Sequence, residues 1–131
     1  MKIQAVLISS AIALGMASPA AAALSLDPET TVSAPGQNVT SWETSASRDA
    51  SRAVALWRCS DGSNERIQAR SLEAGTWGPT AILSPSTGDG GSPQVAMSAS
   101  GTTAVAVWKL EMGATSILQT RWFNNGSWGP L

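Results

Sequence analysis

The segments AVALWR (residues 53–58) and AVAVWK (residues 104–109) decide the fold, because they are two copies of one apolar strand. Each is followed at the same spacing by a Trp-Gly-Pro triplet, at residues 77–79 and 128–130. A single offset aligns both pairs without a gap, and Trp57 and Trp108 lie 51 positions apart. Self-similarity at a fixed period is the signature of a repeat protein. The sequence therefore predicts two repeats, at about residues 30–80 and 81–131.

Each repeat has the pattern of four short strands. In the second repeat these are residues 93–97, an apolar run at 104–108, residues 115–123 and a short strand at Trp128. The continuous apolar run predicts a strand that is buried on both faces. A loop is expected at residues 111–114, a flexible connector at 88–91, and an Asn-Asn-Gly hairpin turn at 124–126.

Four strands in roughly 50 residues are typical of one blade of a β-propeller. We therefore expect an all-β chain of two four-stranded, antiparallel, blade-like repeats, as part of a larger or oligomeric propeller. A β-sandwich of about eight strands and a β-solenoid remain alternatives.

The match also extends backwards, because residues 28–33 align with residues 79–84. Residues 28–33 are thus expected to form the last strand of a preceding repeat. Two blades cannot close a ring, which leaves two hypotheses. The chain is a segment of a larger propeller, or copies assemble by strand exchange, each lending residues 28–33 to a neighbour.

The motifs SPQVA (residues 92–96), LQTR (118–121) and GSWGP (126–130) resemble the blade repeat of secreted bacterial β-propeller proteins with sialidase-like blades. The stretch SLEAGTW (71–77) is similar to the Asp-box hairpin of sialidases, with Glu in place of Asp and one residue fewer before Trp. The resemblance covers nearly all of the chain after residue 23 and implies a propeller fold. A fold alone does not specify a function.

The first 23 residues have the pattern of an export signal. Lys2 supplies the positive start, residues 3–16 are mostly apolar, and small residues surround a cleavage site after Ala22 or Ala23. The apolar run is shorter than the roughly 20 residues of a membrane-spanning helix, so we expect no membrane span after cleavage. The repeat domain, residues 24–131, is thus predicted to be secreted, to the periplasm or the exterior.

The composition argues against several classes of function. Charged residues are 13% of the chain and the net charge is −1, so no basic face is available for nucleic acid. The chain lacks Tyr, the sialidase nucleophile, and lacks His, the usual general base and metal ligand. We therefore predict a non-enzyme without catalytic residues, cofactor or metal. A glycoside hydrolase with an unrecognised pair of acids is a remote alternative.

Six Trp residues point to a binding function. Four recur at the repeat offset, which packing between repeats explains, whereas Trp42 and Trp122 align with Pro93 and Ser71. Exposed Trp rings stack on sugars, and neighbouring polar side chains bind sugar hydroxyls. The leading hypothesis is a binding module for a glycan, and the alternative is a structural segment without a ligand. The candidate ligand-binding residues are Trp42, Trp122, Arg70, Arg121, Gln68 and Gln119. For the Arg and Gln side chains, hydrogen bonding between strands of one repeat is the alternative, and it is favoured.

Two further features have both structural and functional interpretations. Cys59, the single cysteine, aligns with Leu110 and is either a buried apolar residue or an intermolecular thiol. The loop at residues 61–65 carries oxygen ligands but lacks the spacing of a calcium loop, so a solvated loop is favoured.

Overall fold

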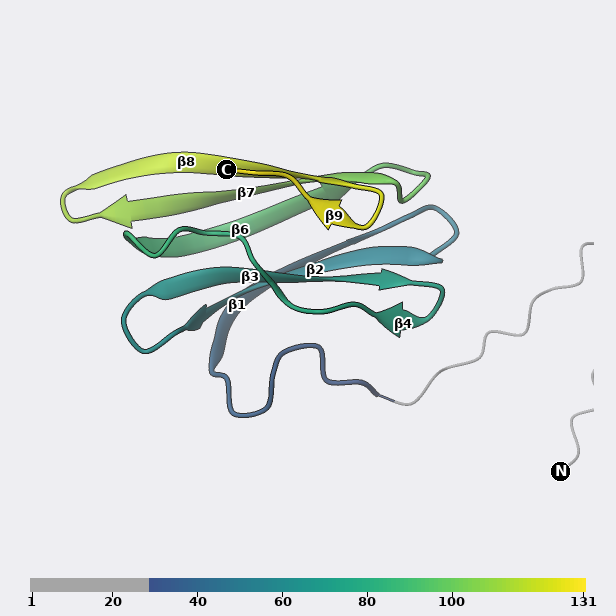
Figure 1. Ribbon diagram of the computed structural model, residues 1–131, viewed down its shortest axis with the longest axis horizontal. Coiled ribbons are helices and arrows are strands. Elements are labelled where there is room, and N and C mark those ends of the chain that lie inside the picture. The colour runs from purple at the N-terminus through teal and green to yellow at the C-terminus, as the bar shows by residue number, and fades with distance from the viewer. Residues whose placement is uncertain (1–28) are drawn as a thin grey trace, which may run out of the picture.

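The structure is a computed structural model that describes residues 29–131, and every regular element in this part of the chain is a β-strand. The strands form two antiparallel sheets that lie one on the other (Figure 1). The N-terminal repeat builds one sheet and the C-terminal repeat builds the other. The prediction of an all-β, antiparallel fold is confirmed, and the two sheets are open rather than joined into a ring.

The first sheet has the strand order β1-β2-β3-β4. A further short strand, β5, also pairs directly with β3, at a different place along that strand from β4. Its elements are β1 (Val39–Ala46), β2 (Arg52–Ser60), β3 (Glu65–Glu73), β4 (Thr76–Trp77) and β5 (Ala81–Ile82). The second sheet repeats this plan in the order β6-β7-β8-β9. Its elements are β6 (Asp89–Met97), β7 (Thr103–Met112), β8 (Thr115–Asn124) and β9 (Ser127–Trp128).

The tight turns that precede β4 and β9 follow from their sequences. Asn125 and Gly126 have positive φ values of 44° and 87°, as a two-residue hairpin turn requires. Ala74 and Gly75 take the same conformation in the first repeat, with φ values of 48° and 79°. The predicted hairpin at residues 124–126 is thus confirmed.

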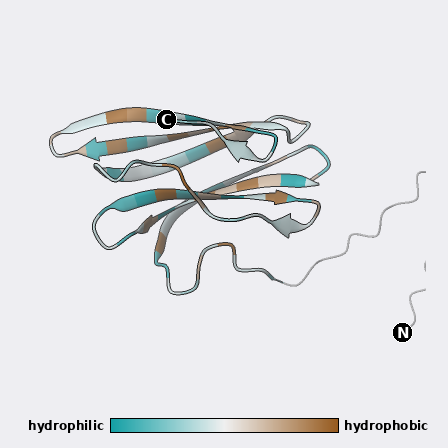
Figure 2. Ribbon diagram, viewed as in Figure 1, coloured by the Kyte–Doolittle hydropathy of each residue, from teal (hydrophilic) through white to brown (hydrophobic). Residues whose placement is uncertain are grey.

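The main core lies between the sheets. The first sheet contributes Val54, Leu56, Ile67 and Ala69, and the second contributes Ala104, Ala106, Trp108, Leu110 and Phe123. Leu83, on the connection between the sheets, is buried with them. Figure 2 shows apolar residues on strands of both sheets, as this packing requires.

The two sheets use opposite faces for this contact. Trp108 points into the core between the sheets, whereas its repeat counterpart Trp57 lies on the far face of the first sheet with Ala55 and Cys59. The repeats are therefore stacked in the same orientation rather than back to back. Each sheet consequently has one face on its neighbour and one face without a neighbouring sheet.

Three predicted details are wrong. Residues 29–33 form no strand and pair with no sheet edge within the described part of the chain, whereas their counterpart β5 pairs with β3. The predicted connector at residues 88–91 belongs to β6 from Asp89 onward, and the predicted loop at 111–114 shrinks to a turn because β7 continues to Met112.

The apolar run at residues 104–108 is also not buried on both faces. Ala104, Ala106 and Trp108 are buried, but Val105 and Val107 are only half-buried. Among residues 29–131, no third sheet covers the face on which these two valines lie. The equivalent run in the first repeat is buried from Val54 to Trp57.

The predicted export signal and Pro28 lie outside the described residues. Within residues 29–131, no helix is long and apolar enough to cross a membrane.

Candidate binding surface

The open face of the first sheet carries a shallow pocket beside an exposed aromatic ring. Trp42 on β1 is 70% exposed and pairs in register with Trp57 on β2, which pairs in turn with Gln68 on β3. These three side chains therefore lie in one row across the sheet. The pocket has a volume of about 330 Å³, and its lining includes Val32, Val39 and Thr44 with Trp42 and Trp57.

The segment before β1 covers part of this face. Val32 packs against the cluster of Ala55, Trp57 and Cys59. The Gln37 side chain donates a hydrogen bond from Nε2 to Gln68 Oε1 at 3.1 Å. Val32 and Ser33 thus form one wall of the pocket, and the exposed Trp42 forms another.

Arg70 and Arg121 hold their own chain together. Arg70 Nε donates to Gly78 O at 2.6 Å, and Arg121 Nε donates to the equivalent Gly129 O at 2.7 Å. Arg70 Nη1 also reaches Val32 O at 3.0 Å. Arg121 Nη1 makes the matching bonds to Ile82 O and Leu83 O, at 3.1 and 3.3 Å. Each guanidinium therefore connects the end of a short outer strand to the segment that precedes the next large strand, at Val32 or at residues 82–83. Each one has few donors left for a ligand.

The two candidate glutamines are also used within the fold. Gln68 is 6% exposed and accepts the bond from Gln37. Gln119 Oε1 accepts a hydrogen bond from the indole nitrogen of Trp108 at 3.2 Å. Both side chains thus satisfy buried or half-buried polar groups of the protein itself.

The first repeat lacks this Trp–Gln bond. Gln68 Oε1 accepts from Gln37 instead, and the Trp57 indole nitrogen is buried without a nitrogen or oxygen acceptor among the described residues. The Cys59 sulfur nearby is a weak acceptor. Burial raises the pKa of the Cys59 thiol, and the Trp57 indole opposes that shift only in part. Cys59 is fully buried and unpaired, as expected for an apolar packing residue.

The structure separates the candidate residues into three groups. Trp42, Gln68 and Arg70 share the open face of the first sheet, as the β1–β2–β3 register shows. Gln119 and Arg121 lie on the face of the second sheet that packs on the first. Trp122 is 63% exposed on the opposite, open face of the second sheet. Trp42 and Trp122 are therefore at opposite ends of the stack and do not form one site.

The acidic side chains with shifted pKa values serve turns and loops. Asp49 accepts hydrogen bonds from the Ser47 and Ser51 hydroxyls and the Ser51 amide, which lowers its pKa to about 2. Asp61 accepts bonds from the amides of Asn64 and Ser63 and from Arg66, which also lowers its pKa to about 2. A general acid needs a raised pKa, so neither carboxyl is suited to that role. Among the described residues no group of His, Cys, Asp or Glu could hold a metal ion.

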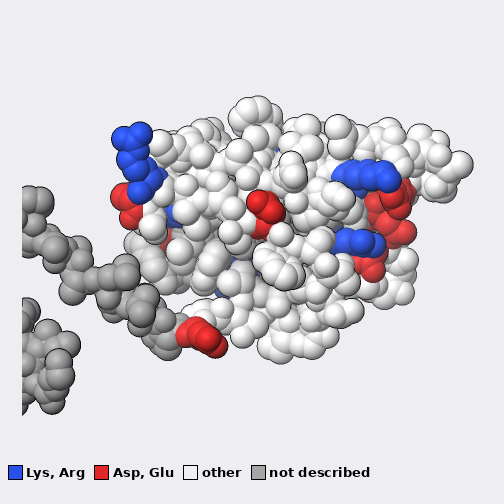
Figure 3. Space-filling view, turned by 180° about the vertical axis from the view of Figure 1, so that it is seen from behind, with Lys and Arg blue, Asp and Glu red and all other residues white. Residues whose placement is uncertain are grey.

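Charged side chains gather toward two ends of the molecule, and most of the surface between them in Figure 3 is uncharged. The ion pair of Arg52 with Glu73 lies at one end of β2, and that of Arg58 with Glu65 lies at the other end. The central surface is thus suited to an uncharged ligand or partner.

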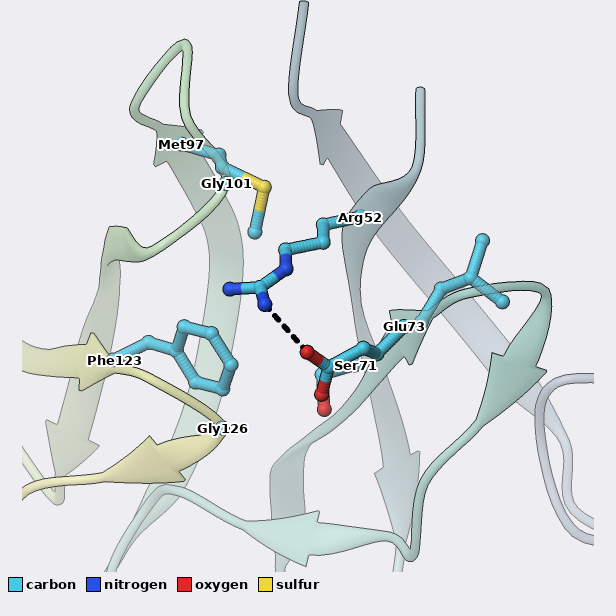
Figure 4. A pocket seen from close by; sticks show the side chains of 8 residues that line it. Arg52, Ser71, Glu73, Met97, Gly101, Phe123 and Gly126 are labelled. Atoms are coloured by element: carbon cyan, nitrogen blue, oxygen red, sulfur yellow. Dashed lines mark hydrogen bonds and ion pairs between the residues drawn. The ribbon is translucent and has the colours of Figure 1, made fainter. Parts of the chain in front are cut away.

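A second hollow lies between the sheets and is too small for a ligand. Met97 and Phe123 of the second sheet face Arg52, Ser71 and Glu73 of the first (Figure 4). Its volume is about 10 Å³, close to the minimum that holds one water molecule. The Arg52–Glu73 ion pair, at 2.6 Å, borders it.

The sequence did not identify the wall residues Val32, Val39 and Thr44. The alternation of Trp42 and Thr44 along β1 carries a weak signal. The position of Val32 depends on how the segment before β1 folds back over the sheet, and no local pattern encodes that path.

Comparison of the chain with protein-family models, with curated proteins and with solved structures gives no significant match. The functional argument therefore depends on the residues of this chain alone.

Proposed function

We propose that the protein is an exported, non-catalytic binding module built from propeller-type blades, and that its ligand is a carbohydrate. The ligand site is the pocket of about 330 Å³ on the open face of the first sheet. This size lies at the lower end of the range of about 300–1,000 Å³ that small-ligand pockets occupy.

The observation that carries this proposal is the exposed ring of Trp42 beside that pocket. An aromatic ring that is 70% exposed leaves a large apolar area in water unless a ligand or partner covers it. A sugar ring presents C–H groups on one face and hydroxyls at its rim. Trp42 offers a face for the C–H groups, and Thr44 and Ser33, which also line the pocket, carry hydroxyls that can form hydrogen bonds.

The test is a titration of the purified protein with soluble oligosaccharides, followed by isothermal titration calorimetry at a protein concentration low enough to keep the chain monomeric, because the heat of binding does not require Trp42 as a reporter. We expect saturable binding that Trp42→Ala abolishes or weakens by about tenfold or more, equivalent to ~1.4 kcal/mol. Trp122→Ala is the matched control, because it removes a similarly exposed ring from the other end of the stack. Unchanged binding by Trp42→Ala, or no binding across a broad glycan array, would refute the proposal.

A second function is favoured by the two open sheet faces. A module that lacks neighbours on both faces is also suited to be a scaffold segment that packs into a larger propeller and has no ligand of its own. In that case the isolated protein would bind no glycan and would unfold with low cooperativity.

A further inference from the structure

We infer that the open face of the second sheet binds the open face of the first sheet on a second copy of this chain. The contact joins two different surfaces, head to tail, in the way the two sheets already join within one molecule. This inference goes beyond the proposed glycan binding and concerns the same open face, so a second copy and a glycan would compete for the pocket beside Trp42. It differs from an exchange of strands because both sheets stay intact.

The donor surface is defined by Val105, Val107, Leu118, Thr120 and Trp122 on β7 and β8. By the repeat offset these residues correspond to Val54, Leu56, Ile67, Ala69 and Ser71. The first four of those counterparts are buried against the second sheet. Leu118 is 75% exposed where Ile67 is 0% exposed, so the donor surface is a sheet face that has no sheet packed on it.

The acceptor surface is the face of the first sheet that carries Ala55, Trp57 and Cys59. Its counterparts in the second sheet, Ala106, Trp108 and Leu110, are the residues onto which the first sheet packs. One molecule therefore has an open donor surface and an open acceptor surface, and the repeat counterparts of these two surfaces already pack on each other between its two sheets. A second copy is the partner that supplies the missing half on each side.

Trp122 is explained by this arrangement. Its counterpart Ser71 borders a groove of about 320 Å³ between the sheets, with Arg121, Gly126 and Trp128 on the opposite wall. The counterparts of these three residues, Arg70, Gly75 and Trp77, line an open groove of about 460 Å³ on the acceptor surface. Head-to-tail contact places the Trp122 ring of one copy in the Arg70–Trp77 groove of the next.

The chemistry of the groove suits an indole ring. The Arg70 guanidinium is fixed by bonds to Gly78 O, Trp77 O and Val32 O, so its plane is held in place. A fixed guanidinium and an aromatic wall both stack on a Trp ring. Ser71 leaves the groove between the two sheets unfilled, whereas Trp122 is large enough to fill the open groove on the acceptor surface.

The substitutions on the acceptor surface predict a wider spacing between copies than between the two sheets of one chain. Gly90 lies so near Ile67 that an added Cβ would be 2.7 Å from Ile67 Cγ1. Val39 occupies the equivalent position on the acceptor surface, and Trp42 occupies that of Pro93. The larger side chains of Val39 and Trp42 on the acceptor surface, and of Trp122 on the donor surface, thus keep two copies farther apart than the two sheets of one chain. A contact between different surfaces repeats, and it gives a ring if the rotation closes or a filament if it does not.

The test is a mixing experiment, measured by sedimentation velocity at micromolar concentrations without added sugar. Thr44→Arg blocks the acceptor surface and Thr120→Arg blocks the donor surface, and both positions are exposed, so the fold is expected to tolerate them. Ser63→Arg, in an exposed loop away from both surfaces, is the matched control. Circular dichroism and thermal melts check that each variant is folded.

We expect wild type and Ser63→Arg to associate and each blocked variant alone to be a monomer. An equimolar mixture of the two blocked variants should form a dimer that does not grow, because it retains one donor and one acceptor surface that match. A monomeric wild type, or a blocked variant that dimerises by itself, would overturn the inference. Glycan binding is tested separately on Thr120→Arg, whose Trp42 pocket is intact, so failure of either proposal is distinguishable from failure of the other.

Discussion

Replacing Ile67 by alanine should destabilise the protein far more than the same change at the repeat-equivalent Leu118. Ile67 is 0% exposed and packs against Gly90 across the two sheets, whereas Leu118 is 75% exposed. Truncation of a fully buried Ile costs about 2–5 kcal/mol, from lost burial and the cavity left behind. We expect about 3 kcal/mol for Ile67→Ala, and less than about 0.5 kcal/mol for Leu118→Ala.

The assay is urea denaturation followed by Trp fluorescence, at a protein concentration low enough to keep the chain monomeric. A domain of this size has a free energy of unfolding of about 5–15 kcal/mol, so a loss of about 3 kcal/mol is readily measured. At higher concentration, where copies associate, the cost of Leu118→Ala should increase. Equal costs for the two variants at low concentration would refute the assignment of an inner and an open face.

Three further predictions concern turns, charge and the thiol. Gly101→Ala should destabilise the protein by about 1–3 kcal/mol, because φ is +71° and an added Cβ would lie 2.7 Å from Arg52 Cβ. Ala50 is at the equivalent turn position with a φ of 56°, so Ala50→Gly should be neutral or stabilising in the same denaturation assay. The pKa of Asp61 is lowered from 3.8 to about 2, so its contribution to stability is present above pH 4 and is lost as the pH falls toward 2. The difference in melting temperature between wild type and Asp61→Asn should shrink over that range. A constant difference would contradict a stabilising role of the Asp61 carboxylate. Burial raises the pKa of the Cys59 thiol, so an aromatic disulfide reagent should modify it much faster in urea than in the native protein, as followed by absorbance.

The repeat itself was predictable from sequence because it is written in local patterns. The apolar strands at residues 53–58 and 104–109, and the Asn125–Gly126 turn, specify strands and hairpins through period and backbone conformation. Their recurrence at one offset also predicted that the two repeats form equivalent sheets. All of this depends on residues close together in the chain.

The way the sheets stack was not predictable in the same way. Val105 and Val54 occupy the same repeat position, yet one lies on an open face and the other in the core, because only one of them has a neighbouring sheet. On β8 the alternation of side chains places Trp122 on the face opposite to Gln119 and Arg121, and the neighbouring sheet decides which of these two faces is buried. Burial at these positions depends on the number and order of repeats in space.

The candidate site was partly predictable. Trp42 and Trp122 break the repeat, and that irregularity marked them as residues with a separate role. The polar candidates were assigned from their place on the third strand of each repeat, but Arg70 and Arg121 use donors to bind the carbonyls of Gly78 and Gly129. Such bonds depend on outer strands whose course the sequence pattern does not reveal.

Within one chain, the two repeat-related sheets pack on each other through opposite, non-equivalent faces. Nuclear Overhauser contacts in the isotope-labelled protein test this stacking at the sites where the sheets approach each other closely. If the sheets stack in this way, cross-peaks connect the Ile67 methyl groups to the Gly90 α-protons and the Arg52 side chain to Gly101, and all of them persist on dilution. Strong contacts within each sheet together with the absence of both contacts between sheets would contradict it.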